Sequence, residues 1–425
     1  MPQVNGVQIL ADKLPEPIYR FIVTAGKEAD KLGYRIYLVG GIVRDLILSQ
    51  PGKDIDIMVE GNAPALARVL TEITGSKKMV IHAKFGTATF HLDNYRLDFA
   101  TCRSETYSRP GALPSVKPGT IQDDLLRRDF TVNAIAININ PSNFGEIVDL
   151  YGGLQDLSNG LIRILHDNSF QDDATRIMRA VRYEQRLNFR LENNTEDLLK
   201  NNLDMLDTIS PDRLKREVIL WLNEKSPELI LKRADELGIL RKIHRSLRWN
   251  NKLEVAFRRA HQKLLVDSHV YCFFSILAYQ LDEPQLDELL QRLNMRGTKF
   301  DTIARQAIII KQNKNFLIKP ELTNSELYFH LCRRPLTAVQ VNWFYPNHHL
   351  MRRRLNLFLK KLYRVRPFIN GKTLHEMGVK PGPIVGEILN SLLSARLDGI
   401  IKTRKEEEQM VGQFLKNQFI EQNRR

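Results

Sequence analysis

The stretch Leu38-Val39-Gly40-Gly41-Ile42-Val43-Arg44-Asp45, followed nine residues later by Asp54-Ile55-Asp56, decides how the chain begins to fold. A run of β-forming residues over 34–39 leads into the glycine pair, and the residues after the pair predict the start of a helix. Side chains two positions apart on a strand point to the same face of a sheet. We therefore expect Asp54 and Asp56 to bind a divalent metal ion together.

The glycine pair predicts a phosphate site beside this metal site. Glycine lets the backbone approach a ligand closely and adopt a positive φ angle. Free N–H groups and the dipole at the start of a helix favour phosphate there. We expect the amides of Gly40 and Gly41 and the side chain of Arg44 to contact phosphate oxygens. Alone, a glycine pair is usually a turn and Asp-x-Asp usually a solvated loop, but together they favour a site that transfers a nucleotide from a triphosphate.

Length and composition indicate an ordinary soluble globular protein. The chain has 425 residues, of which 43% are hydrophobic and 26% charged, and about three domains are expected at this length. No apolar stretch approaches the ~18–20 residues of a membrane span, and the N-terminus does not resemble a secretory signal. Three distant cysteines (Cys102, Cys272, Cys332) predict a reducing cytoplasm, with no disulfide framework and no cysteine-based zinc site.

The charge balance favours a polyanionic partner. The chain carries 63 basic and 49 acidic residues, which gives a net charge of +14. A protein of this charge binds nucleic acid more readily than a membrane surface. We expect no membrane association.

The pattern of the chain changes along its length. Up to about residue 150, β-forming runs alternate with helical patterns: strands are predicted over 34–39, 55–59, 79–82, 87–92, 97–101 and 134–139, and helices over 17–32 and 63–74. A hairpin turn is predicted at Asp93-Asn94. Beyond Phe170 the spacing is helical almost to the end. The segment 104–122, rich in proline and glycine, is predicted to be a long loop, and such loops are usually functional or mobile.

A second motif, Arg127-Arg128-Asp129-Phe130-Thr131-Val132-Asn133-Ala134, also suits a nucleotide. Adjacent guanidinium groups make forked contacts to phosphates. The nearby carboxylate of Asp129 and amide of Asn133 can bind sugar hydroxyls. The alternative is an Arg–Asp pair on a helix surface.

A third motif over 170–186 predicts a helix with a stripe of arginines. Four arginines on one face repel one another unless an anion or acidic neighbours lie there: Arg176, Arg179, Arg182 and Arg186. Asp173 beside Arg176 presents an acceptor next to donors, which matches the edges of cytosine and adenine but not those of uracil or guanine. The alternative is a salt-bridged helix facing solvent.

These motifs, together with 149–156, resemble in order those of class II tRNA nucleotidyltransferases, the CCA-adding enzymes, which share a superfamily with bacterial poly(A) polymerases. The resemblance is specific over about 35–220 and weak afterwards. It implies an α+β fold: a mixed-sheet nucleotidyltransferase head (1–150) followed by an all-α neck (151–225) that holds the base, and an all-α body and tail (226–425) that grip tRNA.

The resemblance also implies roles for individual residues. Asp54 and Asp56 would hold Mg²⁺, with Asp98 as a third carboxylate. Other residues would bind the nucleotide: Gly41, Arg44 and Arg128 at the triphosphate and ribose, Asp173 and Arg176 at the base, and Arg179 and Arg182 beside the phosphates.

A basic run over 351–366 contains no acidic residue and begins with Arg352, Arg353 and Arg354. Its interleaved apolar residues predict a helix with one buried face. The exposed face is expected to follow tRNA phosphates, although a merely solvated basic face is the alternative.

The resulting hypothesis is a template-independent enzyme that completes the tRNA 3′ end with CCA from CTP and ATP, by a two-metal transfer that releases pyrophosphate. The alternatives are an enzyme that adds only the cytidines or only the adenosine, a poly(A) polymerase, and a non-catalytic RNA-binding protein. In the family a flexible loop at 104–122 accompanies the switch from CTP to ATP. Its length disfavours an enzyme that adds only cytidines. No obligate protein partner is inferred.

Overall fold

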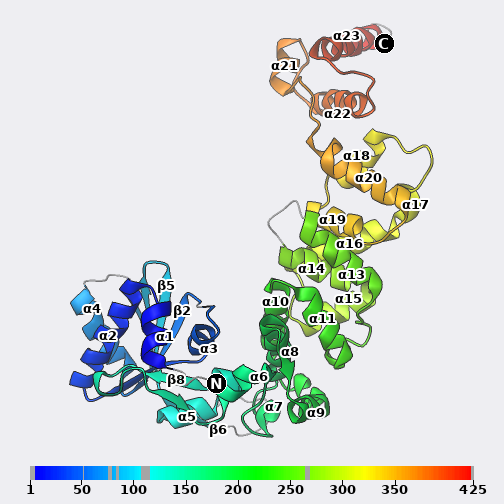
Figure 1. The fold of residues 1–425 in the computed structure, drawn as a ribbon. Coiled ribbons are helices and arrows are strands. Elements are labelled where there is room, and N and C mark those ends of the chain that lie inside the picture. The colour runs from blue at the N-terminus through cyan, green and yellow to red at the C-terminus, as the bar shows by residue number, and fades with distance from the viewer. Residues whose placement is uncertain are drawn as a thin grey trace. The chain divides into compact units, whose positions relative to one another are not determined.

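The computed structural model describes residues 5–50, 52–74, 79–82, 86–106, 115–263 and 269–422, with side chains up to residue 416. The chain forms two compact units, Met1–Lys242 and Ile243–Arg425 (Figure 1). The boundaries that the sequence predicts within these units, after residues 150 and 225, stay predictions. Among the helices of the described ranges, none has the length and apolar character of a membrane span.

Seven strands of the described part of the first unit form one mixed sheet. In sheet order they are β3 (Met79–His82), β4 (Thr87–Leu92), β5 (Tyr95–Thr101), β2 (Asp54–Glu60), β1 (Arg35–Val39), β8 (Ile135–Asn138) and β9 (Ile147–Asp149). β2 and β5 run parallel, and the other neighbours are antiparallel. The six predicted strands are all present, and the predicted turn at Asp93-Asn94 joins β4 to β5. β9 was not predicted.

One face of this sheet is apolar and lies under two helices. The inward side chains of β2 are fully buried: Ile55, Ile57 and Val59. Helices α2 (Glu16–Lys31) and α4 (Ala63–Thr74) cover this face. The ring centroids of Phe21 of α2 and Phe90 of β4 lie 5.0 Å apart. Both helices lie where the sequence predicts them.

The opposite face carries both a packed region and the carboxylates. Helix α5 (Ile121–Leu126) packs there on a cluster of buried residues: Tyr37, Val39, Met58, Cys102, Ile121, Leu125, Ala134 and Ala136. Asp54 and Asp56 lie on this face and are exposed, because they alternate with the buried residues of β2. The prediction that these two aspartates share a face is confirmed.

The predicted loop over 104–122 contains regular structure. Strands β6 (Arg103–Thr106) and β7 (Ser115–Pro118) pair in antiparallel register, and α5 begins at Ile121. The loop prediction is therefore wrong at both ends of the segment. Hydrogen bonding between the two strands determines their conformation there, although the composition favours a loop. The proline- and glycine-rich residues 109–114 lie outside the described residues.

The other α-helices of the described part of the first unit are short. Helix α1 (Gly6–Lys13) precedes the sheet, and α3 (Gly41–Ile47) lies between β1 and β2. After the sheet come α6 (Gly153–Asn159), α7 (Ser169–Asp172), α8 (Thr175–Leu187), α9 (Asn193–Asn201), α10 (Pro211–Asn223), α11 (Pro227–Glu236) and α12 (Ile239–Ile243), which ends at the first residue of the second unit. The helical prediction beyond Phe170 has one exception: β11 (Arg190–Leu191) pairs in parallel with β10 (Leu161–Ile162), a long-range contact that periodicity does not reveal.

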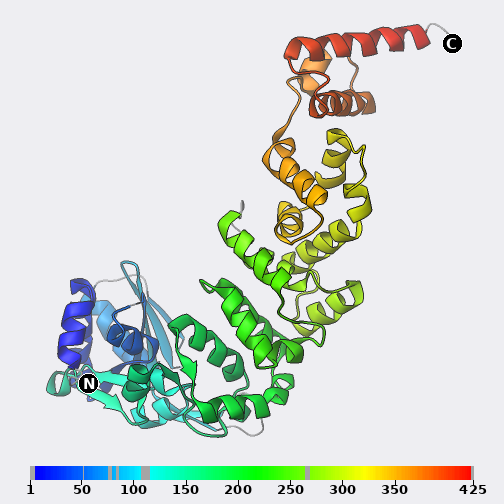
Figure 2. The same ribbon diagram turned by 45° about the vertical axis from the view of Figure 1, so that its right-hand side comes forward.

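The described part of the second unit is helical (Figure 1, Figure 2). Its α-helices are α13 (Asn251–Lys263), α14 (His269–Ala278), α15 (Glu283–Arg292), α16 (Lys299–Gln312), α17 (Lys314–Leu317), α18 (Asn324–Leu331), α19 (Leu336–Phe344), α20 (His349–Lys360), α21 (Gly371–Glu376), α22 (Pro383–Leu397) and α23 (Arg404–Gln422). A separate apolar cluster holds the last three helices together. The predicted fold class, a mixed-sheet head followed by helices, is confirmed.

Candidate active site

A cavity of about 590 Å³ lies in the first unit, between the carboxylate face of the sheet and the helices α7, α8 and α10. Nine of the predicted site residues line it: Gly41, Asp56, Asp98, Arg128, Asp129, Asn133, Asp173, Arg176 and Arg179. Others that the prediction did not include also line it, among them Arg103, Glu105, Arg127, Asp172, Tyr183 and Arg213. Gly40, Arg44, Asp54 and Arg182 are not part of the lining.

The carboxylates of two parallel strands come together at the floor of this cavity. Asp56 of β2 and Asp98 of β5 are direct partners in the strand register. Asp98 accepts hydrogen bonds from the Thr89 hydroxyl at 2.6 Å and from Nε of Arg96 at 3.2 Å. A positively charged side chain, Arg96, thus already pairs with the predicted third carboxylate.

The environment of Asp56 favours a cation. Although water reaches the Asp56 side chain, the surrounding protein removes part of its hydration and so raises its pKa. The negative charges of Asp98 and Asp54 add to this effect despite the opposing charge of Arg128. The ionised carboxylate therefore lacks sufficient positive charge nearby.

The residues present fit a hard divalent metal ion. Within the described ranges, no group of three or more His, Cys, Asp or Glu side chains is placed to hold a metal ion by itself. The three aspartates of this face nevertheless supply the oxygen donors that Mg²⁺ prefers. A cation there would relieve the mutual repulsion of these carboxylates.

The turn between β1 and α3 requires glycine. Gly40 has φ +72° and ψ −131°, and a Cβ atom there would lie 2.4 Å from Nη1 of Arg128. The backbone thus makes room for an arginine of the cavity wall. The Gly40 N–H donates to the Ile135 carbonyl at 3.2 Å, so this amide already has a partner in this structure, and its contact with phosphate stays a prediction. Gly41 does line the cavity.

Arg44 is also placed differently from the prediction. Its side chain is only 3% exposed and pairs with Asp45 at 2.7 Å. Its Nη1 donates to Oδ1 of Asn133 at 2.5 Å. Arg44 therefore does not line the cavity, because its guanidinium group binds Asp45 and Asn133. It orients the Asn133 side chain, which does line the cavity.

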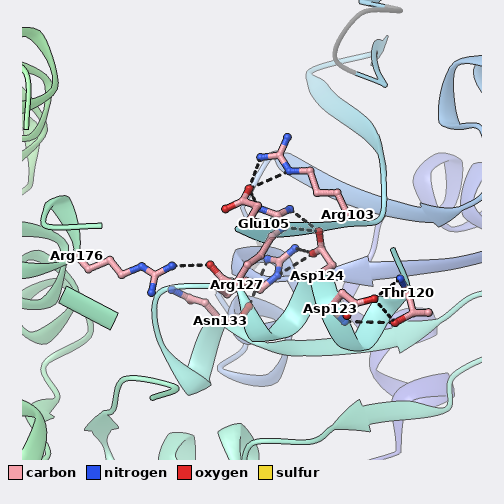
Figure 3. A network of polar contacts seen from close by, with 9 residues as sticks. Arg103, Glu105, Thr120, Asp123, Asp124, Arg127, Asn133 and Arg176 are labelled. Atoms are coloured by element: carbon pink, nitrogen blue, oxygen red, sulfur yellow. Dashed lines mark hydrogen bonds and ion pairs between the residues drawn. The ribbon is translucent and has the colours of Figure 1, made fainter. Parts of the chain in front are cut away.

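The two adjacent arginines share one buried counter-ion, Asp124. Arg128 binds Oδ2 of Asp124 at 2.9 Å. Arg127 binds Oδ1 of the same carboxylate (Figure 3). Arg127 also donates to Glu105 of β6 at 3.2 Å. Asp124 is completely buried. It was not among the predicted site residues, although its spacing of three and four residues from the arginines is the helical spacing of ion pairs.

Asp129 connects the sheet region to helix α8. Its Oδ1 accepts from Nδ2 of Asn133 at 2.9 Å, and its Oδ2 accepts from Nη2 of Arg179 at 2.6 Å. Burial alone would raise the pKa of Asp129, but Arg179 and these hydrogen bonds outweigh it and lower the pKa. The Asp129 charge in turn raises the pKa of Arg179. The pair is ionised and fixes one wall of the cavity.

The four arginines of the α8 stripe have two kinds of surroundings. Arg176 and Arg179 line the cavity, whereas Arg182 and Arg186 pair with glutamates. Arg182 lies buried between Glu217 of α10, at 3.6 Å, and Glu224, the residue that follows α10, at 3.7 Å. Burial raises the pKa of Glu217. Helix α10 therefore covers Arg182, which does not line the cavity in this structure, and its place beside the phosphates stays a prediction. Arg186 also faces Glu224, at 3.8 Å.

The predicted base-reading pair lines the cavity, but each member has its own partners. Nη1 of Arg176 donates to the Ser169 hydroxyl at 2.6 Å, and its Nη2 donates to the Arg127 carbonyl at 2.7 Å (Figure 3). Oδ1 of Asp173 accepts from Nη2 of Arg213 at 2.6 Å. No sequence pattern pointed to Arg213, because the pairing spans two distant segments of the chain.

Tyr183 gathers three arginines around one ring. The guanidinium carbons of Arg44, Arg179 and Arg182 lie 5.1, 5.6 and 5.1 Å from its ring centroid. Such cation–π contacts orient arginines that would otherwise repel one another. A single tyrosine in a helical pattern carries no sequence signal for this role.

The predicted RNA-binding arginines lie on α20 in the second unit. Arg352 and Arg353 line a cavity of about 390 Å³ together with Lys263 and Lys360. Arg354 instead donates to two backbone carbonyls, those of Leu317 at 2.9 Å and Pro320 at 3.1 Å. Two of the three arginines thus border an open basic cavity.

Comparisons with known proteins agree with this geometry. Residues 36–163 match the family described as the poly A polymerase head domain, and residues 188–249 match the probable RNA- and SrmB-binding site of polymerase A. An A-adding tRNA nucleotidyltransferase of Geobacter sulfurreducens is 33% identical over 94% of this chain and 47% of its own length. The A-adding enzyme of Halalkalibacterium halodurans is 30% identical over 96% of each chain.

A solved structure agrees over nearly the full length. The Thermotoga maritima CCA-adding enzyme complexed with tRNA superposes with a TM-score of 0.80 at 29% identity, covering 97% of this chain and 99% of that one. This chain thus spans about half of the Geobacter sulfurreducens relative and nearly all of the other two proteins. The chain belongs to the tRNA nucleotidyltransferase family, in the superfamily that also contains the bacterial poly(A) polymerases.

Proposed function

We propose that this protein adds nucleotides to the 3′ end of tRNA without a template, from CTP and ATP, and releases pyrophosphate. The observation that carries the proposal is that one cavity is lined by carboxylates of the sheet, by several arginines and by Asp173, a hydrogen-bond acceptor for the base. This combination meets the three needs of nucleotidyl transfer: a metal site, a triphosphate site and base selection.

The carboxylates and arginines would position the reacting groups. Asp54, Asp56 and Asp98 would hold Mg²⁺, which supplies charge neutralisation and lowers the pKa of the attacking 3′ hydroxyl. Arg128 and Arg179 line the cavity with fixed guanidinium groups that suit the triphosphate oxygens. Positioning and charge neutralisation then provide most of the rate enhancement.

Base selection would depend on Asp173. An ionised carboxylate only accepts hydrogen bonds, so it favours the amino groups of cytosine and adenine over the carbonyl oxygens of uracil and guanine. Arg176 can donate to the base only after exchanging its bonds to Ser169 and Arg127.

The second unit would bind the body of the tRNA. Residues 1–242 contain 32 basic and 33 acidic residues, whereas residues 243–425 contain 31 and 16. The whole positive excess of the chain therefore belongs to the second unit, where Arg352 and Arg353 border a basic cavity. Phosphate binding by such residues gives strong, salt-dependent affinity. A cytoplasmic location is part of this proposal.

Addition of the terminal adenosine alone is the second candidate. Two relatives that align over 94% and 96% of this chain are A-adding enzymes. The full-length structural match, in contrast, is a CCA-adding enzyme. Asp173 could accept a hydrogen bond from the amino group of either base, so a direct assay distinguishes the two candidates.

The test supplies the purified protein with tRNA transcripts that end before the CCA, after the first C, or after CC. Labelled CTP and ATP are given separately and together, and the products are sequenced. Full CCA on the shortest transcript supports the first candidate, whereas extension only of the CC-ending transcript by one adenosine supports the second. Two results would overturn both candidates. One is the addition of long adenosine tracts, and the other is the same product from the wild type and from the Asp56→Asn variant.

A further inference from the structure

We propose that Arg213 is a positioning residue that sets how Asp173 faces the base of the incoming nucleotide. The inference rests on the proposed function and extends it to base specificity. Arg213 lies in the first turn of α10, lines the cavity, and donates from Nη2 to Oδ1 of Asp173 at 2.6 Å.

The two oxygens of Asp173 are in different situations. Oδ1 accepts three hydrogen bonds: from Arg213, from the Thr175 N–H at 2.9 Å and from the Thr175 hydroxyl at 2.7 Å. In the described part of the chain, Oδ2 has no hydrogen-bond partner, although Asp173 lines the cavity. One oxygen is therefore locked to the protein while the other is available as an acceptor for a ligand.

Helix α10 holds Arg213 in place through contacts on successive turns. One turn after Arg213, Glu217 faces Arg182 of α8. One turn later, the fully buried Trp221 donates its indole N–H to the Met178 carbonyl at 2.9 Å. Residues four apart on a helix share a face. This face of α10 is thus fixed against α8, and the Arg213 guanidinium is held beside the carboxylate.

The fixed acceptor has a chemical consequence. Because Arg213 and Thr175 hold Oδ1, Oδ2 faces the cavity in one orientation, and a carboxylate oxygen accepts hydrogen bonds but donates none. A carboxylate free to rotate could instead accept from an N–H group at another position of the base, such as N3–H of uracil or N1–H of guanine. Arg213 therefore makes Asp173 selective for bases that present an amino group at the ring position where uracil and guanine carry a carbonyl oxygen, without itself needing to contact the base.

The experiment compares Arg213→Gln and Arg213→Lys with Arg216→Gln. Arg216 is an exposed arginine of the same helix that does not line the cavity, so its variant is the matched control. The kcat and KM values for CTP, ATP, UTP and GTP are measured separately on tRNA, and thermal unfolding shows that each variant folds. We expect Arg213→Gln to lower the ratio of kcat/KM between accepted and rejected bases about tenfold, which corresponds to ~1.4 kcal/mol. Arg213→Lys should restore part of that ratio, and Arg216→Gln should keep the wild-type ratio.

Two outcomes separate the failure of this inference from failure of the proposed function. If Arg213→Gln slows all four nucleotides alike and keeps the wild-type ratio, Arg213 only supports the fold and the inference is overturned. If the wild-type protein transfers nothing to tRNA, the proposed function fails. Equilibrium binding of the four nucleotides then decides the inference, which is overturned if Arg213→Gln keeps the wild-type preference. If Arg213→Gln does not fold, the same comparisons apply to Arg213→Lys.

Discussion

Asp129 is buried and receives hydrogen bonds from Arg179 and Asn133, and these contacts lower its pKa. Because its pKa in the folded state lies below the unfolded value of about 3.9, the ionised carboxylate stabilises the fold above about pH 4. This stabilisation is lost as the pH falls through the folded-state pKa.

We therefore expect Asp129→Asn to destabilise the first unit by ~3 kcal/mol at neutral pH, since Arg179 loses its partner. The difference from the wild type should shrink as the pH drops below about 4. Urea unfolding followed by hydrogen exchange of peptides over 121–139 measures it. A difference that stays constant down to the lowest pH would contradict the assignment of this ion pair.

Asp56 has the opposite shift, because burial and the like charges of Asp98 and Asp54 raise its pKa. Its ionised form is thus unfavourable in the metal-free fold above the raised pKa, and the penalty disappears as the pH falls through it. We expect Asp56→Asn to stabilise the metal-free protein at neutral pH by at most ~1 kcal/mol, because water still reaches the side chain.

The same variant should abolish nucleotide incorporation while leaving tRNA affinity near the wild-type value. Thermal unfolding with and without MgCl₂ gives an independent measurement: Mg²⁺ should raise the melting temperature of the wild type and not that of Asp56→Asn. Asp30→Asn, at an exposed position of α2, is the matched control. An equal Mg²⁺ effect in all three proteins would remove Asp56 from the metal site.

At the scale of elements, the turn from β1 into α3 determines where Arg128 lies. Gly40 and Gly33 have similar positive φ angles, +72° and +70°. A Cβ atom at Gly33 meets no atom within 4 Å, whereas at Gly40 it would collide with Arg128. Gly33→Ala thus also forces an L-residue into a positive φ angle, but without the collision.

We expect both alanine variants to lose ~1–2 kcal/mol of stability from the positive φ angle, and Gly40→Ala to lose more. Only Gly40→Ala should raise the KM for nucleotide, by about tenfold or more if one charge-assisted contact to phosphate is displaced. Chemical unfolding and steady-state kinetics measure the two effects. Equal kinetics for the two variants would show that the turn does not place Arg128.

At the scale of the whole molecule, the nucleotide cavity and the basic excess belong to different units. We expect Arg352→Gln with Arg353→Gln to weaken tRNA binding while the KM for nucleotide stays unchanged. The logarithm of the association constant falls linearly with the logarithm of the salt concentration, and the steepness of this line should decrease by roughly 0.7–0.9 for each phosphate contact that is lost. Arg354 is left intact because it binds backbone carbonyls.

Titration of tRNA at several salt concentrations measures this slope. A double variant with the same charge change on α2, Arg20→Gln with Lys27→Gln, is the matched control, since both residues are exposed in the first unit. A wild-type slope in the α20 variant would make that helix a solvated basic face.

Local patterns predicted the parts of the fold that depend on neighbours in sequence. The alternation in β2 placed Asp54 and Asp56 on one face, and glycine at position 40 marked a turn with a positive φ angle. Both outcomes follow from backbone geometry within a few residues. The order of the motifs along the chain was likewise sufficient to identify the family.

Only the tertiary structure decided which charged side chains face the cavity. Arg44 binds Asn133, 89 residues away, and Asp173 binds Arg213, 40 residues away. Helical spacing placed Arg179 and Arg182 on one stripe, yet α10 covers Arg182 and leaves Arg179 at the cavity. Periodicity fixes the face of a helix on which a side chain lies, but the packing of distant elements decides whether that face meets a ligand or a buried carboxylate.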